Sequence, residues 1–228
     1  QPPDAEHLLG TDQVGRDMFS RLLYAMRVSL LVGFLATAIS TVIGVALGLI
    51  SGYFGGTLDI IMMRLLEIIN GIPYLIIVIL LMMILRPGMM TIIIAYSLVG
   101  WIPMARLVRG QVVALKQQEY IAAAEAMGAG PARIIARHLL PNTLSVVIVR
   151  VTLSIPSAIF SEAFLSYIGL GVPLPLASWG VLASDGANKL LTFPYQLLFP
   201  ALLICITMLC FNLMGDGLRD ALDPRMRK

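Results

Sequence analysis

The chain has 228 residues, of which 58% are hydrophobic and only 13% are charged. Soluble domains carry about 45–50% apolar and about 25% charged residues, so this composition excludes a single soluble core and suits a surface that faces lipid. The net charge of +3 is too small to indicate a nucleic-acid partner. We therefore expect an all-α, polytopic membrane protein, because a helix satisfies its own backbone polar groups in lipid.

The first 27 residues are predicted to form an extracytoplasmic or interfacial segment. Met18, Phe19, Leu22, Leu23 and Met26 recur at helical spacing, with arginines among their polar neighbours. This pattern predicts an amphipathic helix that lies in the membrane interface and leads into the first span.

Five apolar segments are predicted to cross the membrane, within a transmembrane domain over residues 28–215. They run from Val28 to Tyr53, from Ile68 to Leu85, from Met89 to Ala105, from Thr143 to Ile168 and from about Leu197 to Met214. At a rise of about 1.5 Å per residue, the first is long enough for a hydrocarbon core of ~30 Å. Five spans leave the chain ends on opposite sides, so we expect a sixth helix upstream of residue 1.

Small side chains recur every four residues in the first span, at Ala36, Ser40, Gly44, Gly48 and Gly52. Such a stripe lets two helices approach closely in lipid, where hydrophobic burial does not drive their association. The first span is therefore predicted to pack against another helix.

Charges outside the spans predict the orientation. If the connection over residues 114–142 is cytoplasmic, most basic residues fall inside, as the positive-inside rule requires. Arg86 and Lys189 then fall outside, and so do Arg16, Arg21 and Arg27 at the start of the chain, which the expected upstream helix accommodates. Arg106 and Arg109 are expected to snorkel towards the headgroups. The tail over residues 216–228 is expected to be cytoplasmic. The basic residues predicted to lie inside are Arg64, Arg106, Arg109, Lys116, Arg133, Arg137, Arg219, Arg225, Arg227 and Lys228.

The connection over residues 114–142 is predicted to form a helix, a glycine turn and a second helix. Good helix formers precede Gly128, which suits a left-handed C-terminal cap. Pro131 suits the first turn of the second helix, and Pro141 is expected to end it. Ala122, Ala123 and Ala124 would give a surface without bulk, so this element is predicted to dock a partner, with an ordinary connector as the alternative.

These residues resemble the signature loop of ABC importer permeases. The loop carries Glu-Ala-Ala, three residues, Gly, and then Leu-Pro thirteen residues after that Gly. Here Ala122-Ala123-Ala124, Gly128 and Leu140-Pro141 stand at that spacing. The chain departs from the pattern at Ala122, where the family has Glu, and an acid stands instead at Glu125.

Other motifs are similar to the dipeptide/oligopeptide permease subfamily and cover nearly the whole chain. They are His7-Leu8-Leu9-Gly10-Thr11-Asp12 with Gly15-Arg16-Asp17, Arg106-Leu107-Val108-Arg109-Gly110, the segment from Phe164 to Gly171, and Gly215-Asp216-Gly217-Leu218-Arg219-Asp220 with Asp223-Pro224. The resemblance implies the type I ABC importer permease fold in a bacterial or archaeal cytoplasmic membrane. It also implies a second permease, two cytoplasmic ATPase subunits and an extracytoplasmic binding protein as partners.

In such importers the loop couples the ATPases to the membrane helices. The residues that the resemblance and the loop's own pattern assign to coupling are Ala122, Ala123, Ala124, Glu125, Gly128, Arg133, Leu140 and Pro141. ATP and Mg²⁺ would be bound by the ATPase subunits, since this chain has no GxxxxGK[ST] segment. We expect no catalytic, cofactor or metal site in it.

Polar residues within the spans are the candidates for a pathway or for contacts between helices: Glu162, Asn70 and Asn212. An ion-coupled secondary transporter would need more such carboxylates and is the weaker alternative. A membrane enzyme is disfavoured because no catalytic set is apparent. A permease for nickel or another small solute remains an alternative for the cargo.

Overall fold

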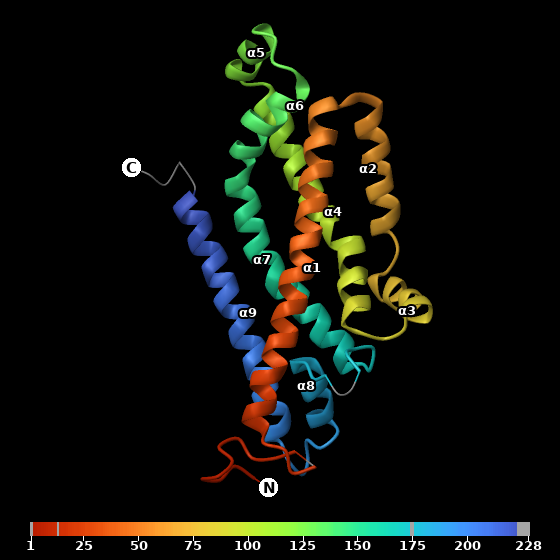
Figure 1. Cartoon of the computed structure of the whole chain (residues 1–228), viewed down its shortest axis with the longest axis vertical. Helices are drawn as coiled ribbons and strands as arrows, with labels where there is room; N and C mark the ends of the chain where they lie inside the picture. Colours follow the sequence, from red (N-terminus) through yellow and green to blue (C-terminus); the bar gives the residue numbers. More distant parts are fainter. Residues whose placement is uncertain (1, 13, 174–175, 223–228) are drawn as a thin grey trace. The chain divides into compact units, whose positions relative to one another are not determined.

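The computed structural model describes residues 2–12, 14–173 and 176–222, and these residues form helices joined by turns (Figure 1). The isolated bridge between Thr11 and Asp17 is the one β-type pairing among them. The all-α prediction is therefore confirmed for the described residues. In chain order they form α1 (Met18–Phe54), α2 (Gly56–Asn70), α3 (Tyr74–Leu85), α4 (Met89–Lys116), α5 (Glu119–Ala126), α6 (Pro131–Ile134), a π-helical turn (Ile135–Leu139), α7 (Leu140–Tyr167), α8 (Trp179–Ala187) and α9 (Tyr195–Leu222).

Within the described residues, four helical stretches are long and apolar enough to cross a membrane, and a fifth exists if α2 and α3 count as one broken span. The second predicted span, from Ile68 to Leu85, is broken near its start, because α2 ends at Asn70 and α3 begins at Tyr74. Pro73 explains the break, since proline donates no N–H and the residue before it avoids the helical region. The four single stretches are Met18–Phe54, Met89–Lys116, Pro131–Tyr167 and Tyr195–Leu222.

Helix α1 begins at Met18, so the predicted amphipathic helix is the first part of the spanning helix and not a separate element. A carboxylate oxygen of Asp17 accepts the backbone N–H of Ser20 at 2.8 Å and caps the helix. Of the predicted apolar stripe, Met18 and Leu22 are buried within this chain, whereas Phe19 and Leu23 are exposed. No proline interrupts the helix, so it continues into the span.

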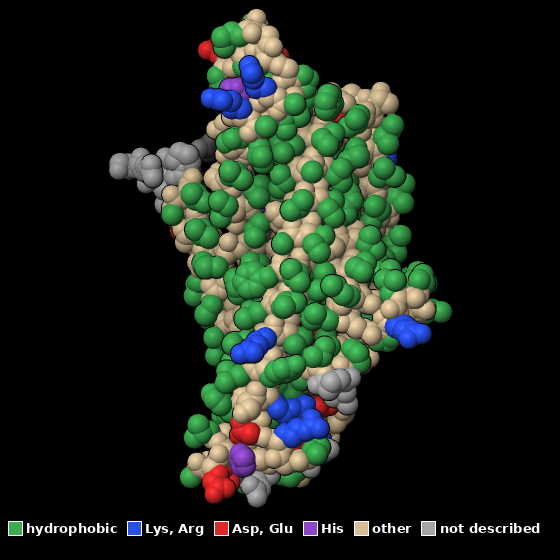
Figure 2. Space-filling model, in the orientation of Figure 1, with side chains coloured by type: hydrophobic (Ala, Val, Ile, Leu, Met, Phe, Trp, Pro, Cys, Tyr) green, Lys and Arg blue, Asp and Glu red, His purple; other side chains and the backbone are tan. Residues whose placement is uncertain are grey.

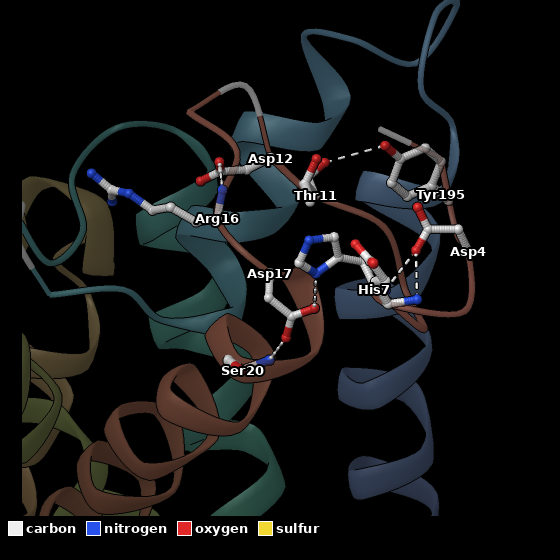
Figure 3. Close-up of polar contacts among 9 residues, drawn as sticks. Asp4, His7, Thr11, Asp12, Arg16, Asp17, Ser20 and Tyr195 are labelled. Carbon is white, nitrogen blue, oxygen red and sulfur yellow. Dashed lines mark hydrogen bonds and ion pairs between the residues drawn. The ribbon is translucent and has the colours of Figure 1, made fainter.

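The segment before α1 is folded by its own polar side chains (Figure 3). The Asp12 carboxylate accepts the backbone N–H groups of Val14 and Arg16, each at 2.8 Å. The other carboxylate oxygen of Asp12 pairs with Arg21 at 2.7 Å. The acid of this motif therefore closes a turn and ties it to α1.

A second acid joins the segment to its neighbours. The hydrogen bonds from Ser20, with a smaller contribution from His7 at 3.2 Å, hold the pKa of Asp17 below its usual value. The hydroxyl of Tyr195, at the start of α9, donates to the carbonyl oxygen of Thr11 at 3.2 Å. The motif that resembles the peptide permeases thus fixes the start of α1.

The chain divides into two compact units, each with parts of several helices. Figure 2 shows hydrophobic side chains over the helices, with charged side chains gathered on the N-terminal segment in unit 1 and on α5 and α6 in unit 2. Such a surface fits helices that contact lipid or other membrane helices. Unit 1 comprises Gln1–Ala36, Leu75–Tyr96 and Ser154–Leu213, and unit 2 comprises Thr37–Tyr74, Ser97–Leu153 and Met214–Lys228.

The stripe of small residues brings α1 against α4 in unit 2, which confirms the predicted packing. A Cβ on Gly44 would lie 2.7 Å from the carbonyl oxygen of Trp101. A Cβ on Gly48 would lie 2.7 Å from that of Ala105. These distances are too short for a side chain, so only glycine allows the two backbones this approach.

Helix α9 extends beyond the predicted fifth span. It runs to Leu222, so residues 216–222 of the predicted tail are helical. The rest of that tail, residues 223–228, lies outside the described residues, as does its Asp223-Pro224 motif.

Candidate functional site

The connection between α4 and α7 contains two short helices joined by a glycine turn, as the sequence predicts. Gly128 has a φ of +83°, which residues with a Cβ rarely adopt. The N–H of Gly128 bonds to the carbonyl of Glu125 at 2.9 Å, and the N–H of Ala129 bonds to that of Ala124 at 3.0 Å. This pair of bonds is the Schellman motif. Helix α5 therefore ends at Ala126, just before the turn at Gly128, and α6 starts at Pro131.

The second helix does not end at Pro141, contrary to the prediction. It passes through the π-helical turn Ile135–Leu139 into α7. In this turn the N–H of Leu140 bonds to the carbonyl of Ile135, five residues back. A shifted bonding pattern just before Pro141, which has no N–H, lets the helix continue. Leu140 is half-buried and Pro141 is exposed.

Apolar side chains fix the α5–α6 hairpin, residues 117–134, to the long helices of unit 2. Ile121 of α5 is 1% exposed and Ile134 of α6 is 0% exposed. Close-packed cores transmit displacement because they hold few voids. The hairpin therefore packs in one apolar cluster with α1, α4 and α7. The buried residues of this cluster are Leu49, Tyr53, Met104, Val108, Val112, Ile121, Ile134, Leu139 and Val147.

The three consecutive alanines of α5 are not equivalent. Ala122 and Ala123 are exposed, whereas Ala124 is only 4% exposed. Ala124 therefore contributes little to the exposed surface of this chain. Glu125 is exposed, and its side chain interacts with Tyr53 near the end of α1.

A groove of about 450 Å³ opens beside the hairpin. Arg133, which was predicted as a coupling residue from the sequence, lines the groove together with Arg137 and His138. Both arginines are exposed. The lining of the groove thus includes both basic side chains and apolar or aromatic side chains. Its lining residues are Tyr120, Ala124, Met127, Ala129, Arg133, Arg137 and His138.

A polar cluster in unit 2 corrects the expectation that Arg109 snorkels. Its guanidinium makes two hydrogen bonds to the carboxylate of Asp59 on α2, each at 2.5 Å. The hydroxyl of Ser51 on α1 donates to the same carboxylate. Asp59 was not among the residues predicted from the sequence, although an isolated carboxylate in an apolar helix is a sign of a buried partner. The cluster joins α1, α2 and α4.

Of the polar candidates within the spans, Glu162 contacts other elements of unit 1. Its side chain is 0% exposed. Its carboxylate accepts the hydroxyls of Ser29 on α1 at 3.0 Å and of Ser166 at 2.7 Å. Asn70, the last residue of α2, and Asn212 on α9 are exposed on this chain. Of the three candidates, only Glu162 is buried in this chain.

Known proteins resemble this chain over most of its length. Residues 44–228 match the family described as binding-protein-dependent transport system inner membrane component. The chain is 53% identical to the oligopeptide transport system permease protein OppC of Bacillus subtilis (strain 168), over 100% of this chain and 75% of that protein. It is 51% identical to the dipeptide transport system permease protein DppC of the same organism, over 100% of this chain and 71% of that protein.

Solved structures give the same fold. One chain of the MetNI methionine ABC transporter, in an inward facing conformation, matches with a TM-score of 0.74 and 19% identity. The match covers 90% of this chain and 98% of that chain. At this identity the likeness shows the fold alone, and it confirms the predicted type I ABC importer permease fold.

Proposed function

The chain belongs to the family of binding-protein-dependent transport system inner membrane components, and we propose that it is a membrane subunit of an ATP-driven peptide importer. The observation that carries the proposal is the similarity along the whole chain to permeases named for oligopeptides and dipeptides, at 53% and 51% identity. Because both names occur at nearly equal identity, the proposed cargo is short peptides as a class.

The importer would contain four kinds of subunit. A second, homologous permease would complete the membrane pathway, and two cytoplasmic ATPase subunits would bind ATP and Mg²⁺. An extracytoplasmic binding protein would deliver the peptide. The missing phosphate-binding segment in this sequence supports this division of labour.

The α5–α6 hairpin is the proposed docking element for one ATPase subunit. Exposed Ala122 and Ala123 would let a partner's backbone approach closely, and the arginines at the groove offer hydrogen-bond donors. The apolar base of the hairpin would carry the partner's movement to the long helices. Gly128 holds the two short helices at a fixed turn.

The proposed orientation puts the hairpin and the C-terminus in the cytoplasm and the connection between α7 and α9 outside. It rests on the positive-inside rule. Single cysteines at Gln117 and at Leu191, which is 100% exposed, test it in a background without Cys205 and Cys210. An impermeant thiol reagent should label the two positions from opposite sides. Labelling from one side would refute the orientation.

The function is tested by reconstitution with the three proposed kinds of partner. Proteoliposomes with all subunits should take up radiolabelled trialanine only with ATP and binding protein, and omission of this chain should abolish uptake. Uptake of a nickel chelate in place of trialanine would assign the alternative cargo. ATP-independent uptake driven by an ion gradient would overturn the importer assignment.

A further inference from the structure

Helix α8 lies in the connection between α7 and α9, yet it is part of the core of unit 1. Trp179 is 1% exposed and Leu182 is 2% exposed. A Cβ on Gly180 would lie 2.4 Å from the carbonyl oxygen of Ala163 on α7. The backbones of α8 and α7 are therefore in direct contact, which a surface loop does not require.

One hydrogen-bond relay joins the first residue of α8 to α1 and α7. The backbone N–H of Trp179 donates to the hydroxyl oxygen of Ser29 at 3.2 Å. That hydroxyl in turn donates to Oε2 of Glu162 at 3.0 Å. The indole Nε1 of Trp179 also donates to the carbonyl oxygen of Leu22, at 3.2 Å.

A second relay starts from the same turn of α8. Ser178 is its N-cap, and its hydroxyl oxygen accepts the backbone N–H of Val181 at 3.3 Å. The Ser178 hydroxyl donates to that of Ser166 at 3.2 Å. The Ser166 hydroxyl donates to Oε1 of Glu162 at 2.7 Å.

Both relays run in one direction and end on the same carboxylate. Each serine hydroxyl donates its one hydrogen in the direction of Glu162, and its oxygen accepts a hydrogen bond from the side of α8. The end of the two relays must therefore offer two acceptor atoms, which a carboxylate does, whereas an amide offers one oxygen and one NH₂ donor.

We propose that Glu162 is a positioning residue that anchors the first turn of α8 to α1 and α7 through Ser29, Ser166 and Ser178. Helix α8 then moves together with these helices during transport and not as a separate loop. This inference goes beyond the proposed function, because Glu162 acts through α8 and makes no contact with the cargo.

The anchor is tested by the reactivity of a buried cysteine on α8. Ala183 is 7% exposed, so Ala183→Cys should be protected from a maleimide in the assembled complex without Cys205 and Cys210. Glu162→Gln replaces one acceptor by a donor, leaves a serine hydroxyl unsatisfied, and should raise the labelling rate roughly tenfold or more. Ser161→Ala is the matched control, because its hydroxyl bonds to its own helix at Ser157.

The serines show whether Glu162 acts through the relays. Ser29→Ala and Ser166→Ala should each raise the labelling rate. Adding Ser29→Ala to Glu162→Gln should add little, since both break one relay. If Glu162→Gln does not assemble, the two serine variants carry the same test. Independent, multiplicative effects on labelling would overturn the relay.

Uptake separates an anchor from a pathway residue. In proteoliposomes, Glu162→Gln should lower the maximal rate of trialanine uptake while the half-saturating concentration stays unchanged. Unchanged protection of Ala183→Cys in Glu162→Gln overturns the proposal whatever happens to uptake. Protection together with a shifted half-saturating concentration would assign Glu162 to the pathway. The labelling itself needs no cargo, so it stands even if the peptide assignment fails.

Discussion

The α5–α6 hairpin and α8 are both short helical elements inserted between long helices, but they are held in different ways. The hairpin is attached by an apolar base and a glycine turn, and it leaves Ala122, Ala123 and a groove exposed. Helix α8 is attached by buried hydrogen bonds and by direct contact between backbones at Gly180. Exposure suits a surface for a partner, whereas burial suits a part that must keep its place.

The largest effect expected from this comparison is at Gly180. Gly180→Leu would force α8 off α7, because even a Cβ lies 2.4 Å from a backbone oxygen. We expect a loss of about 3 kcal/mol or more of stability, measured as thermal unfolding of the purified complex. Gly110→Leu is the control, since a Cβ on Gly110 would have no neighbour within 4 Å. Equal unfolding temperatures for Gly180→Leu and Gly110→Leu would mean that α8 does not pack against α7 as described.

Two neighbouring alanines sharpen the contrast inside the hairpin. Ala124→Phe places a large ring at a buried position and should destabilise the complex by about 1–3 kcal/mol. Ala123→Phe lies on the exposed face, so unfolding should be unaffected while stimulation of ATP hydrolysis by loaded binding protein is lost. Melting and ATPase rates measured on the same preparations distinguish the two effects. If Ala123→Phe lowered stability and Ala124→Phe did not, the assignment of the buried and exposed faces of α5 would be wrong.

The glycine turn is expected to be sensitive to backbone conformation alone. A Cβ on Gly128 would meet nothing within 4 Å, but its φ is +83°. Gly128→Val should therefore strain the turn by about 1–2 kcal/mol and reduce uptake roughly 5–30-fold, at near-normal membrane levels. Gly128→Asn should retain most uptake, because asparagine tolerates this region. Full uptake in Gly128→Val would reduce the hairpin to a connector.

The smallest effect concerns the cap at the start of α1, in the unit that contains α8. The pKa of Asp17 is lower in the folded protein than in the unfolded chain. Its ionised form therefore contributes stability in full above the ordinary value of about 3.9, and this contribution is lost as the pH falls through the folded pKa. The free energies of unfolding of the parent and of Asp17→Asn, measured from neutral to acid pH, should become equal below the folded pKa of Asp17. A difference in unfolding free energy that stays constant with pH would mean that the charge of Asp17 does not contribute to the cap.

Patterns along the chain were enough for the regular features. Composition predicted membrane helices, the four-residue repeat through Gly44 and Gly48 predicted close packing, and Gly128 after a run of good helix formers predicted the turn. Each depends on neighbours in sequence or on helical periodicity. The start of α1 at Met18 and the break before Pro73 were misjudged, because the limits of a charge-free stretch do not mark where a helix begins or ends.

The role of each polar residue depended on tertiary contacts. The sequence by itself determined the fold class, the family resemblance and the position of the hairpin, since these follow from periodicity and from local motifs. It left open whether Glu162 contacts another helix or faces a pathway. It also predicted that Arg109 reaches the lipid headgroups. Only the tertiary structure brought Asp59 to Arg109, Ser29 to Glu162, and Ala124 into the interior. These partners lie far apart in the chain or on a helix face that only packing selects, so no local pattern specifies them.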